Sequence, residues 1–170
     1  MEVQIGGSKI GRCDYEENHE TFEIIERPYG GQSLVLCKAK NDGTSDKEAS
    51  SLIVNKTIGT IAEGRRDSIA IKQIAEYVFK LYSGNIKAAL GIISADFETN
   101  TIVVSRCMEE PVYYMIGGNC SCWQNGCTTI GQNKVAQPSI TEIPLAMGGT
   151  VVMLTAGVHN VGKAFGKGRE

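Results

Sequence analysis

The stretch SLVLCKAKNDGTSDKEASSLIVNK, residues 33–56, decides the fold because it joins a short apolar segment to an amphipathic one through a polar turn. The apolar run from Leu34 to Cys37 predicts a strand. Ser45 stands three residues before Glu48, which fits a capping box at the start of a helix. The helical period then continues through Ala49, Leu52, Ile53 and Ile61. We therefore expect a strand, a turn and a helix that ends near Gly64.

Extended segments precede this stretch. Short apolar runs predict strands at Val3–Ile5 and Thr21–Ile25, both broken off by polar residues and glycine. Pro28 favours an extended residue before it, and Gly30-Gly31 supplies a flexible turn. The strand at Thr21–Ile25 is therefore expected to form a hairpin with the strand at Leu34–Cys37.

A second helix follows the first. Asp67 is the expected N-cap, and Ser83-Gly84 closes the segment. Its apolar residues fall on one face, formed by Ile71, Ile74, Ala75, Val78 and Tyr82.

The rest of the chain returns to extended structure, and Gly117–Gly131 is a polar stretch expected to contain a hairpin tip. Two helices cannot cover both faces of a single sheet with so many strands. We therefore expect an α/β (α+β) fold, a β-sandwich of two mainly antiparallel sheets flanked by helices, in one domain covering residues 1–170. The further strands are expected at Ala88–Ala95, Thr101–Ser105, Pro111–Ile116, Ile140–Pro144 and Thr150–Leu154.

Composition excludes several classes of partner. The 170 residues are 42% hydrophobic and carry a formal net charge of -2, so the chain can bury one core and has no basic field for nucleic acid or an anionic membrane. Apolar runs such as Ala88–Ala95 are far shorter than the roughly 20 residues that span a bilayer. The N-terminal residues lack the apolar core of a secretory signal, and we expect a cytoplasmic protein.

Six cysteines, expected as thiols in a reducing compartment, include a C-x-C-x4-C cluster formed by Cys120, Cys122 and Cys127. Three thiolates so close in sequence suggest either a zinc site or simple loop thiols. The spacing differs from the usual C-x2-C knuckle, and the only histidines, His19 and His159, lie far away in sequence. Loop thiols are therefore the favoured interpretation.

Three segments resemble the SpoIIE/RsbX class of the metal-dependent (PPM-type) serine/threonine protein phosphatases. They are residues 33–56, residues 60–106 (TIAEGRRDSIAIKQIAEYVFKLYSGNIKAALGIISADFETNTIVVSR) and residues 141–166 (TEIPLAMGGTVVMLTAGVHNVGKAFG). The resemblance runs from about Glu17 to the end of the chain and needs no gap across Ser33–Lys56. It implies a β-sandwich flanked by helices, and it suggests that the last strand of the family pattern is missing here.

The resemblance also implies where metal ligands belong. Family members end the strand before the first helix in an Asp-Gly-x-Gly-x-Gly motif, whose Asp and following Gly carbonyl help to hold two metal ions and position the attacking water. In this chain Lys38 matches the Asp and Ala39 the first Gly, while Asn41 and Gly43 match the later glycines. Aligning Asp42-Gly43 instead would shorten the run to Ser50 by about one helical turn.

Two further positions complete the implied site. Ala156-Gly157 matches a second Asp-Gly pair that supplies another ligand, so a second acid is replaced. His19-Glu20 matches an acidic position, which makes Glu20 the one retained carboxylate and the one candidate metal ligand. Because divalent cations need anionic oxygens around them, metal binding is expected to fail.

Lys38 has two interpretations. In the first, its ammonium stands beside Glu20 as a built-in counterion, because a buried carboxylate needs a partner. Alternatively it points to solvent, since lysine is seldom buried.

Three other residues attract simpler interpretations. Asp96 is expected to cap a hairpin turn. His159 has no orienting acid in its motif and is weak as a general base. Cys37 adjoins Lys38, which would favour a thiolate, but the end of an apolar strand favours a core thiol.

Three functions follow. The first is a pseudophosphatase that binds a phosphorylatable partner, which the resemblance implies to be a STAS-type regulatory protein of sporulation, sigma-factor control or the stressosome. The second is an active phosphatase that uses Mn²⁺ or Mg²⁺, and the third is a non-catalytic scaffold that uses the cysteine-rich loop. We favour the first, with no cofactor expected, no nucleic acid or membrane partner, and a homodimer as one open possibility.

Overall fold

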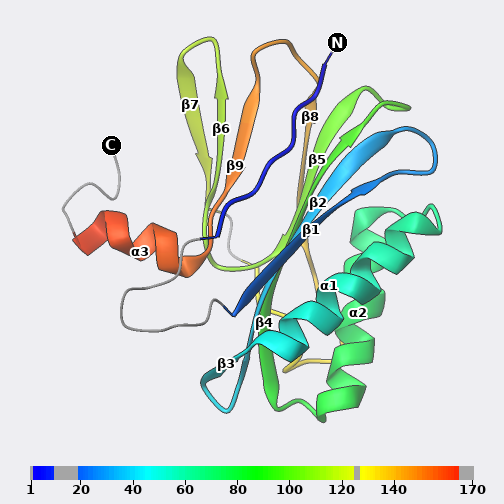
Figure 1. The fold of residues 1–170 in the computed structure, drawn as a ribbon, viewed down its shortest axis with the longest axis vertical. Helices are drawn as coiled ribbons and strands as arrows, with labels where there is room; N and C mark the ends of the chain where they lie inside the picture. The colour runs from blue at the N-terminus through cyan, green and yellow to red at the C-terminus, as the bar shows by residue number, and fades with distance from the viewer. Residues whose placement is uncertain (1, 10–18, 125–126, 165–170) are drawn as a thin grey trace.

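The computed structural model describes residues 2–9, 19–124 and 127–164, with the backbone alone for residues 161–164. Nine strands and three helices lie in these ranges (Figure 1). In chain order they are β1 (Glu20–Glu26), β2 (Gly31–Asn41), β3 (Thr44–Asp46), α1 (Lys47–Ala62), α2 (Asp67–Tyr82), β4 (Ile86–Asp96), β5 (Thr101–Cys107), β6 (Val112–Ile116), β7 (Asn119–Trp123), β8 (Ser139–Pro144), β9 (Thr150–Met153) and α3 (Ala156–Ala164).

The strands form two antiparallel sheets. The larger has the order β1-β2-β4-β5-β8, with β3 paired to β2, and the smaller has the order β7-β6-β9. The predicted hairpin of β1 and β2 is confirmed, and its register places Glu20 opposite Lys38.

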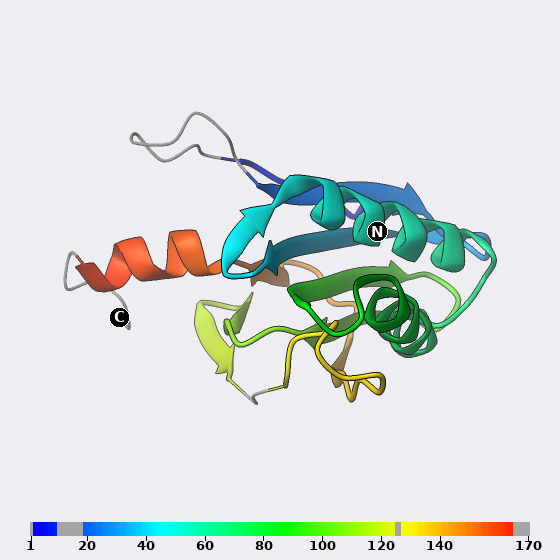
Figure 2. The ribbon, with the colours of Figure 1, turned by 90° about the horizontal axis from the view of Figure 1, so that it is seen from below.

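Helices and the second sheet cover opposite faces of the large sheet. Both α1 and α2 pack on one face, α1 over β1 and β2 and α2 over β4 and β5 (Figure 1). On the other face Gly91 of β4 lies against Met153 of β9, so the small sheet packs there. The predicted α+β sandwich flanked by helices is confirmed, and α3 extends away from these layers (Figure 2).

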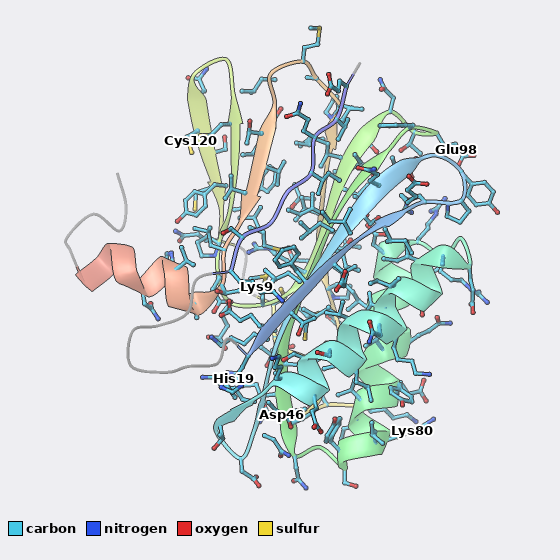
Figure 3. All side chains as sticks on the ribbon, viewed as in Figure 1. Lys9, His19, Asp46, Lys80, Glu98 and Cys120 are labelled. Carbon is cyan, nitrogen blue, oxygen red and sulfur yellow. The ribbon has the colours of Figure 1, made fainter. Side chains whose placement is uncertain are left out.

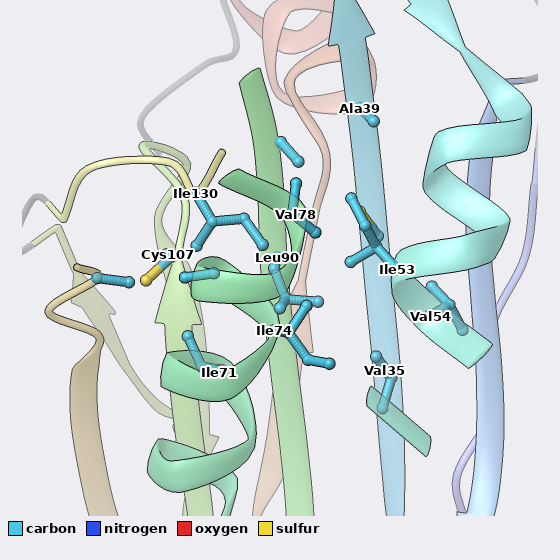
Figure 4. Packing of buried hydrophobic residues seen from close by; sticks show 14 of the residues in the cluster. Val35, Ala39, Ile53, Val54, Ile71, Ile74, Val78, Leu90, Cys107 and Ile130 are labelled. Carbon is cyan, nitrogen blue, oxygen red and sulfur yellow. The ribbon is translucent and has the colours of Figure 1, made fainter. Parts of the chain in front are cut away.

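The main core lies between the large sheet and the two helices. Because side chains alternate along a strand, Val35, Cys37 and Ala39 of β2 join the buried cluster on the helix side. Ile53 of α1 and Ile74 of α2 meet them there (Figure 4). The intervening residues of β2, among them Lys38, face the small sheet instead.

Both helices begin one residue away from their predicted caps. The N-cap of α1 is Asp46, whose carboxylate accepts a hydrogen bond from the Ala49 N–H at 2.8 Å, while Ser45 pairs within β3. The prediction of a capping box that begins at Ser45 is therefore wrong. An aspartate provides the same acceptor for the free N–H groups of the first turn.

Asp67 was predicted as the N-cap of α2, and this was wrong because Arg66 occupies that position. Asp67 is instead the first helical residue, and its carboxylate is 97% buried. It accepts hydrogen bonds from Arg27 Nη1 at 2.8 Å and from Ser94 Oγ at 2.6 Å. A buried carboxylate needs such partners, and this one ties α2 to the β1–β2 turn and to β4.

The predicted ends of both helices are confirmed near Gly64 and at Ser83, which adopts the left-handed conformation. Residues 3–5, predicted as a strand, lie outside any strand. The strands β3 and β7 and the helix α3 were not predicted: β3 has only three residues, too few to show a period, and the polar residues of β7 lie in a stretch that was expected to contain a hairpin tip.

Candidate functional site

Glu20 and Lys38 form an ion pair between the two sheets. Their opposed positions in the β1–β2 hairpin turn both side chains toward the small sheet. Lys38 Nζ donates to Glu20 Oε1 at 2.7 Å, and only 23% of the lysine side chain and 16% of the glutamate side chain are exposed. The predicted counterion contact is confirmed, and the solvent-exposed alternative for Lys38 is wrong.

The start of α3 reaches the same place. A Cβ atom added at Gly157 would lie 3.8 Å from Glu20 Oε1 and 3.9 Å from Thr155 Oγ1. Thr155 and Ala156 line a pocket of about 10 Å³ together with Lys38, which is close to the minimum volume for one water molecule. The positions singled out near residue 38 and residue 156 therefore meet, although more than a hundred residues separate them.

Glu110 is a third charged residue here, and sequence reasoning missed it. Its side chain lines the same pocket, and its Oε2 is buried with no hydrogen-bond partner among the residues that the structure describes. Glu109-Glu110 lies just after β5, separated from it by Met108, at the point where the chain crosses from the large sheet to the small one. An acidic pair at such a crossover was the available signal.

The turn after Lys38 is fixed by the backbone. Asp42 and Gly43 both have positive φ angles, 49° and 80°, and form the two-residue tip between β2 and β3. They are therefore turn residues, and Asn41 ends β2. Ala39 is fully buried on the helix side, and its N–H donates to Ser50 Oγ at 2.9 Å.

These residues do not fit a pair of divalent cations. Such a pair needs several anionic oxygens arranged around it, whereas Lys38 places a cation on the Glu20 carboxylate. Neither Ala39 nor Ala156 has a side chain that can bind metal. Within residues 2–9, 19–124 and 127–160, whose side chains are described, no group of three or more His, Cys, Asp or Glu could hold a metal ion.

Other candidate residues lie elsewhere. Asp96 Oδ1 accepts from the N–H groups of Glu98 and Thr99, which confirms its turn role. Cys37 is a core thiol as predicted, and burial raises its pKa. His159 lies on α3 and is not among the residues that line the Lys38 pocket. His19 borders a separate open depression beside Asn41 and Thr44.

The C-x-C-x4-C cluster is not formed. Cys120 and Cys122 are exposed on β7, where Figure 3 labels Cys120. Cys127 instead lies against β5, with Sγ 2.9 Å from the Arg106 carbonyl oxygen. The structure thus offers no zinc cluster of these three thiols.

Neither family models nor the sequences of curated proteins match this chain. Solved structures do match its fold. The PP2C phosphatase domain of the cell-fate determinant SpoIIE from Bacillus subtilis superposes with a TM-score of 0.69 at 16% identity, covering 85% of this chain and 43% of that one. The S. agalactiae serine/threonine phosphatase gives a TM-score of 0.67 at 13% identity, covering 84% of this chain and 74% of that one.

A third match is the PPM Ser-Thr phosphatase MsPP from Mycobacterium smegmatis, with a TM-score of 0.62 at 14% identity over 81% of this chain and 71% of that one. The chain therefore has the fold of the PPM-type serine/threonine phosphatases.

In addition, none of the helices in the described residues is long and apolar enough to cross a membrane.

Proposed function

We propose that this chain, which has the fold of the metal-dependent PPM-type phosphatases, is a cytoplasmic pseudophosphatase that binds a phosphorylatable partner without hydrolysing it. The observation that carries the proposal is the ion pair between Lys38 Nζ and Glu20 Oε1 at 2.7 Å. It lies where the sequence resemblance expects a metal ligand. The ammonium of Lys38 neutralises the Glu20 carboxylate, which a metal ion would need as a ligand.

Charge explains why hydrolysis should be lost. Two divalent cations close together repel each other, and only surrounding carboxylates offset that repulsion. The Lys38 ammonium pairs with Glu20, Glu110 lines the same pocket as Lys38, and Ala156 contributes no charge. Without bound metal there is nothing to lower the pKa of an attacking water.

The proposed partner is a STAS-type regulatory protein. This rests on the resemblance to SpoIIE/RsbX-like domains, and the SpoIIE domain among the structural matches is consistent with it.

The test compares the natural chain with a Lys38→Asp, Ala156→Asp double variant. Mn²⁺ binding is measured by calorimetry, and hydrolysis is measured with a phosphoserine peptide. We expect the natural chain to do neither and the double variant to gain Mn²⁺ binding. Lys72→Asp, the same lysine-to-aspartate change on the exposed face of α2, should gain nothing.

Manganese binding with turnover by the natural chain would overturn the proposal and make this a working phosphatase. Partner binding is tested separately, with a STAS-domain protein in its phosphorylated and unphosphorylated forms. Phosphate-dependent binding without phosphate release supports the proposal. Equal or absent binding of both forms would refute the partner class.

A further inference from the structure

Cys127 lies beside Cys107, although the sequence groups it with Cys120 and Cys122. Its Sγ is 2.9 Å from the carbonyl oxygen of Arg106 and 3.4 Å from that of Met108. These two carbonyls flank Cys107 on either side. A sulfur that contacts both carbonyls lies alongside residue 107.

The two thiols differ in their surroundings. Cys107 ends β5 and is fully buried in the core cluster, on the same side as Ile130 (Figure 4). Cys127 is half-buried on the segment that leads to β8. A small oxidant therefore reaches Cys127 first, because Cys107 is the more deeply buried of the two thiols.

The hydrogen bond from the Cys107 thiol lowers the pKa of Cys127, and burial opposes this. Backbone N–H groups of Met108 and Ser139 and the charge of Arg106 lower it further. The Arg106 carbonyl favours the protonated thiol and limits the shift. The same pairing raises the pKa of Cys107, and this together with the greater exposure of Cys127 favours Cys127 as the nucleophile of the pair.

We propose that Cys107 and Cys127 form a reversible disulfide when the protein meets a peroxide. The Cys127 sulfur attacks one peroxide oxygen and the O–O bond breaks, which gives a sulfenic acid and one water from hydrogen peroxide. The Cys107 sulfur then attacks the sulfenic sulfur. Hydroxide leaves with the Cys107 proton as a second water, and the S–S bond forms. The peroxide is reduced by two electrons, which the two thiols supply, and a thiol reductant reverses the change.

The bond would tie the segment that begins at Cys127 to the end of β5. It closes a loop of about 20 residues that contains the β6–β7 hairpin. Closing such a loop restricts the unfolded chain, so oxidation should raise Tm by roughly 5 to 10 °C. This inference does not depend on the proposed function.

The test treats the full chain with hydrogen peroxide, blocks the remaining thiols and maps linked peptides by mass spectrometry. We expect a Cys107–Cys127 peptide, a higher Tm, and loss of both on treatment with dithiothreitol. Cys127→Ser should abolish the peptide and the shift, and Cys120→Ser, a matched change of an exposed cysteine, should keep both. If Cys127→Ser does not fold, the peptide map of the natural chain decides alone.

Three results would overturn the proposal. One is a treated chain in which Cys107 can still be alkylated after unfolding. Another is linkage of Cys127 only to Cys120 or Cys122. The third is irreversible oxidation of Cys127 with no linked peptide.

Discussion

Replacement of Lys38 by methionine removes the ammonium that lies 2.7 Å from Glu20 Oε1 while keeping most of the side-chain volume. Exposed ion pairs contribute about 0–1 kcal/mol to stability, and breaking a fully buried pair costs about 3–5 kcal/mol. The exposed fractions here, 23% and 16%, place this pair between those limits. We expect Lys38→Met to lower the free energy of unfolding by about 1–2 kcal/mol, or Tm by about 3–6 °C.

A double-mutant cycle isolates the interaction itself. Urea unfolding is measured for Lys38→Met, Glu20→Gln and the double variant. The double variant should lose less than the sum of the two single losses, by about 1 kcal/mol. Lys40→Met, an exposed lysine two residues along the same strand, is the matched control and should change stability by less than about 0.5 kcal/mol.

The reasoning fails if Lys38→Met is as stable as the natural chain. It fails equally if the two single losses simply add, because the two charges then act independently. In either case the lysine would not be the counterion that replaces a metal.

Three further predictions concern the framework. Gly31→Ala should lower the free energy of unfolding by at least about 3 kcal/mol, because its Cβ would overlap the Ala95 carbonyl and φ is 99°. Gly59→Ala on the open face of α1 should raise it by about 0.5–1 kcal/mol. Urea unfolding that shows equal effects of the two changes would contradict this. Asp67→Asn should cost about 3 kcal/mol in the same assay, because it removes the anion that Arg27 contacts in a buried site, and a loss under 1 kcal/mol would refute the buried pair. Burial raises the pKa of Cys37 above its ordinary 9.0, so above pH 9 the folded chain keeps a proton that the unfolded chain releases. The contribution of this thiol to the free energy of unfolding should therefore be fully present below pH 9. Above pH 9 the free energy of unfolding should fall by up to about 1.4 kcal/mol per pH unit. Cys37→Ala should show a smaller fall between pH 8 and pH 10, and an equal fall would exclude this thiol as the cause.

The sequence by itself determined the elements whose signals lie in neighbouring residues. The β1–β2 hairpin, both long helices, the Asp96 turn and the buried position of Cys37 all follow from local periodicity, turn residues and apolar runs. The resemblance to the phosphatase family predicts metal-ligand positions at Lys38 and Ala156, and residue type alone shows that an ammonium or a methyl group cannot bind a cation.

Only the tertiary structure decided which distant side chains meet. Glu110 and Lys38 line one pocket, and Asp67 accepts a hydrogen bond from Arg27 rather than capping a helix. Cys127 lies against the end of β5 rather than beside its sequence neighbours. These contacts depend on strand register and on how the two sheets and the helices pack. Packing free energy is shared over the whole core, so no short stretch of sequence contains it.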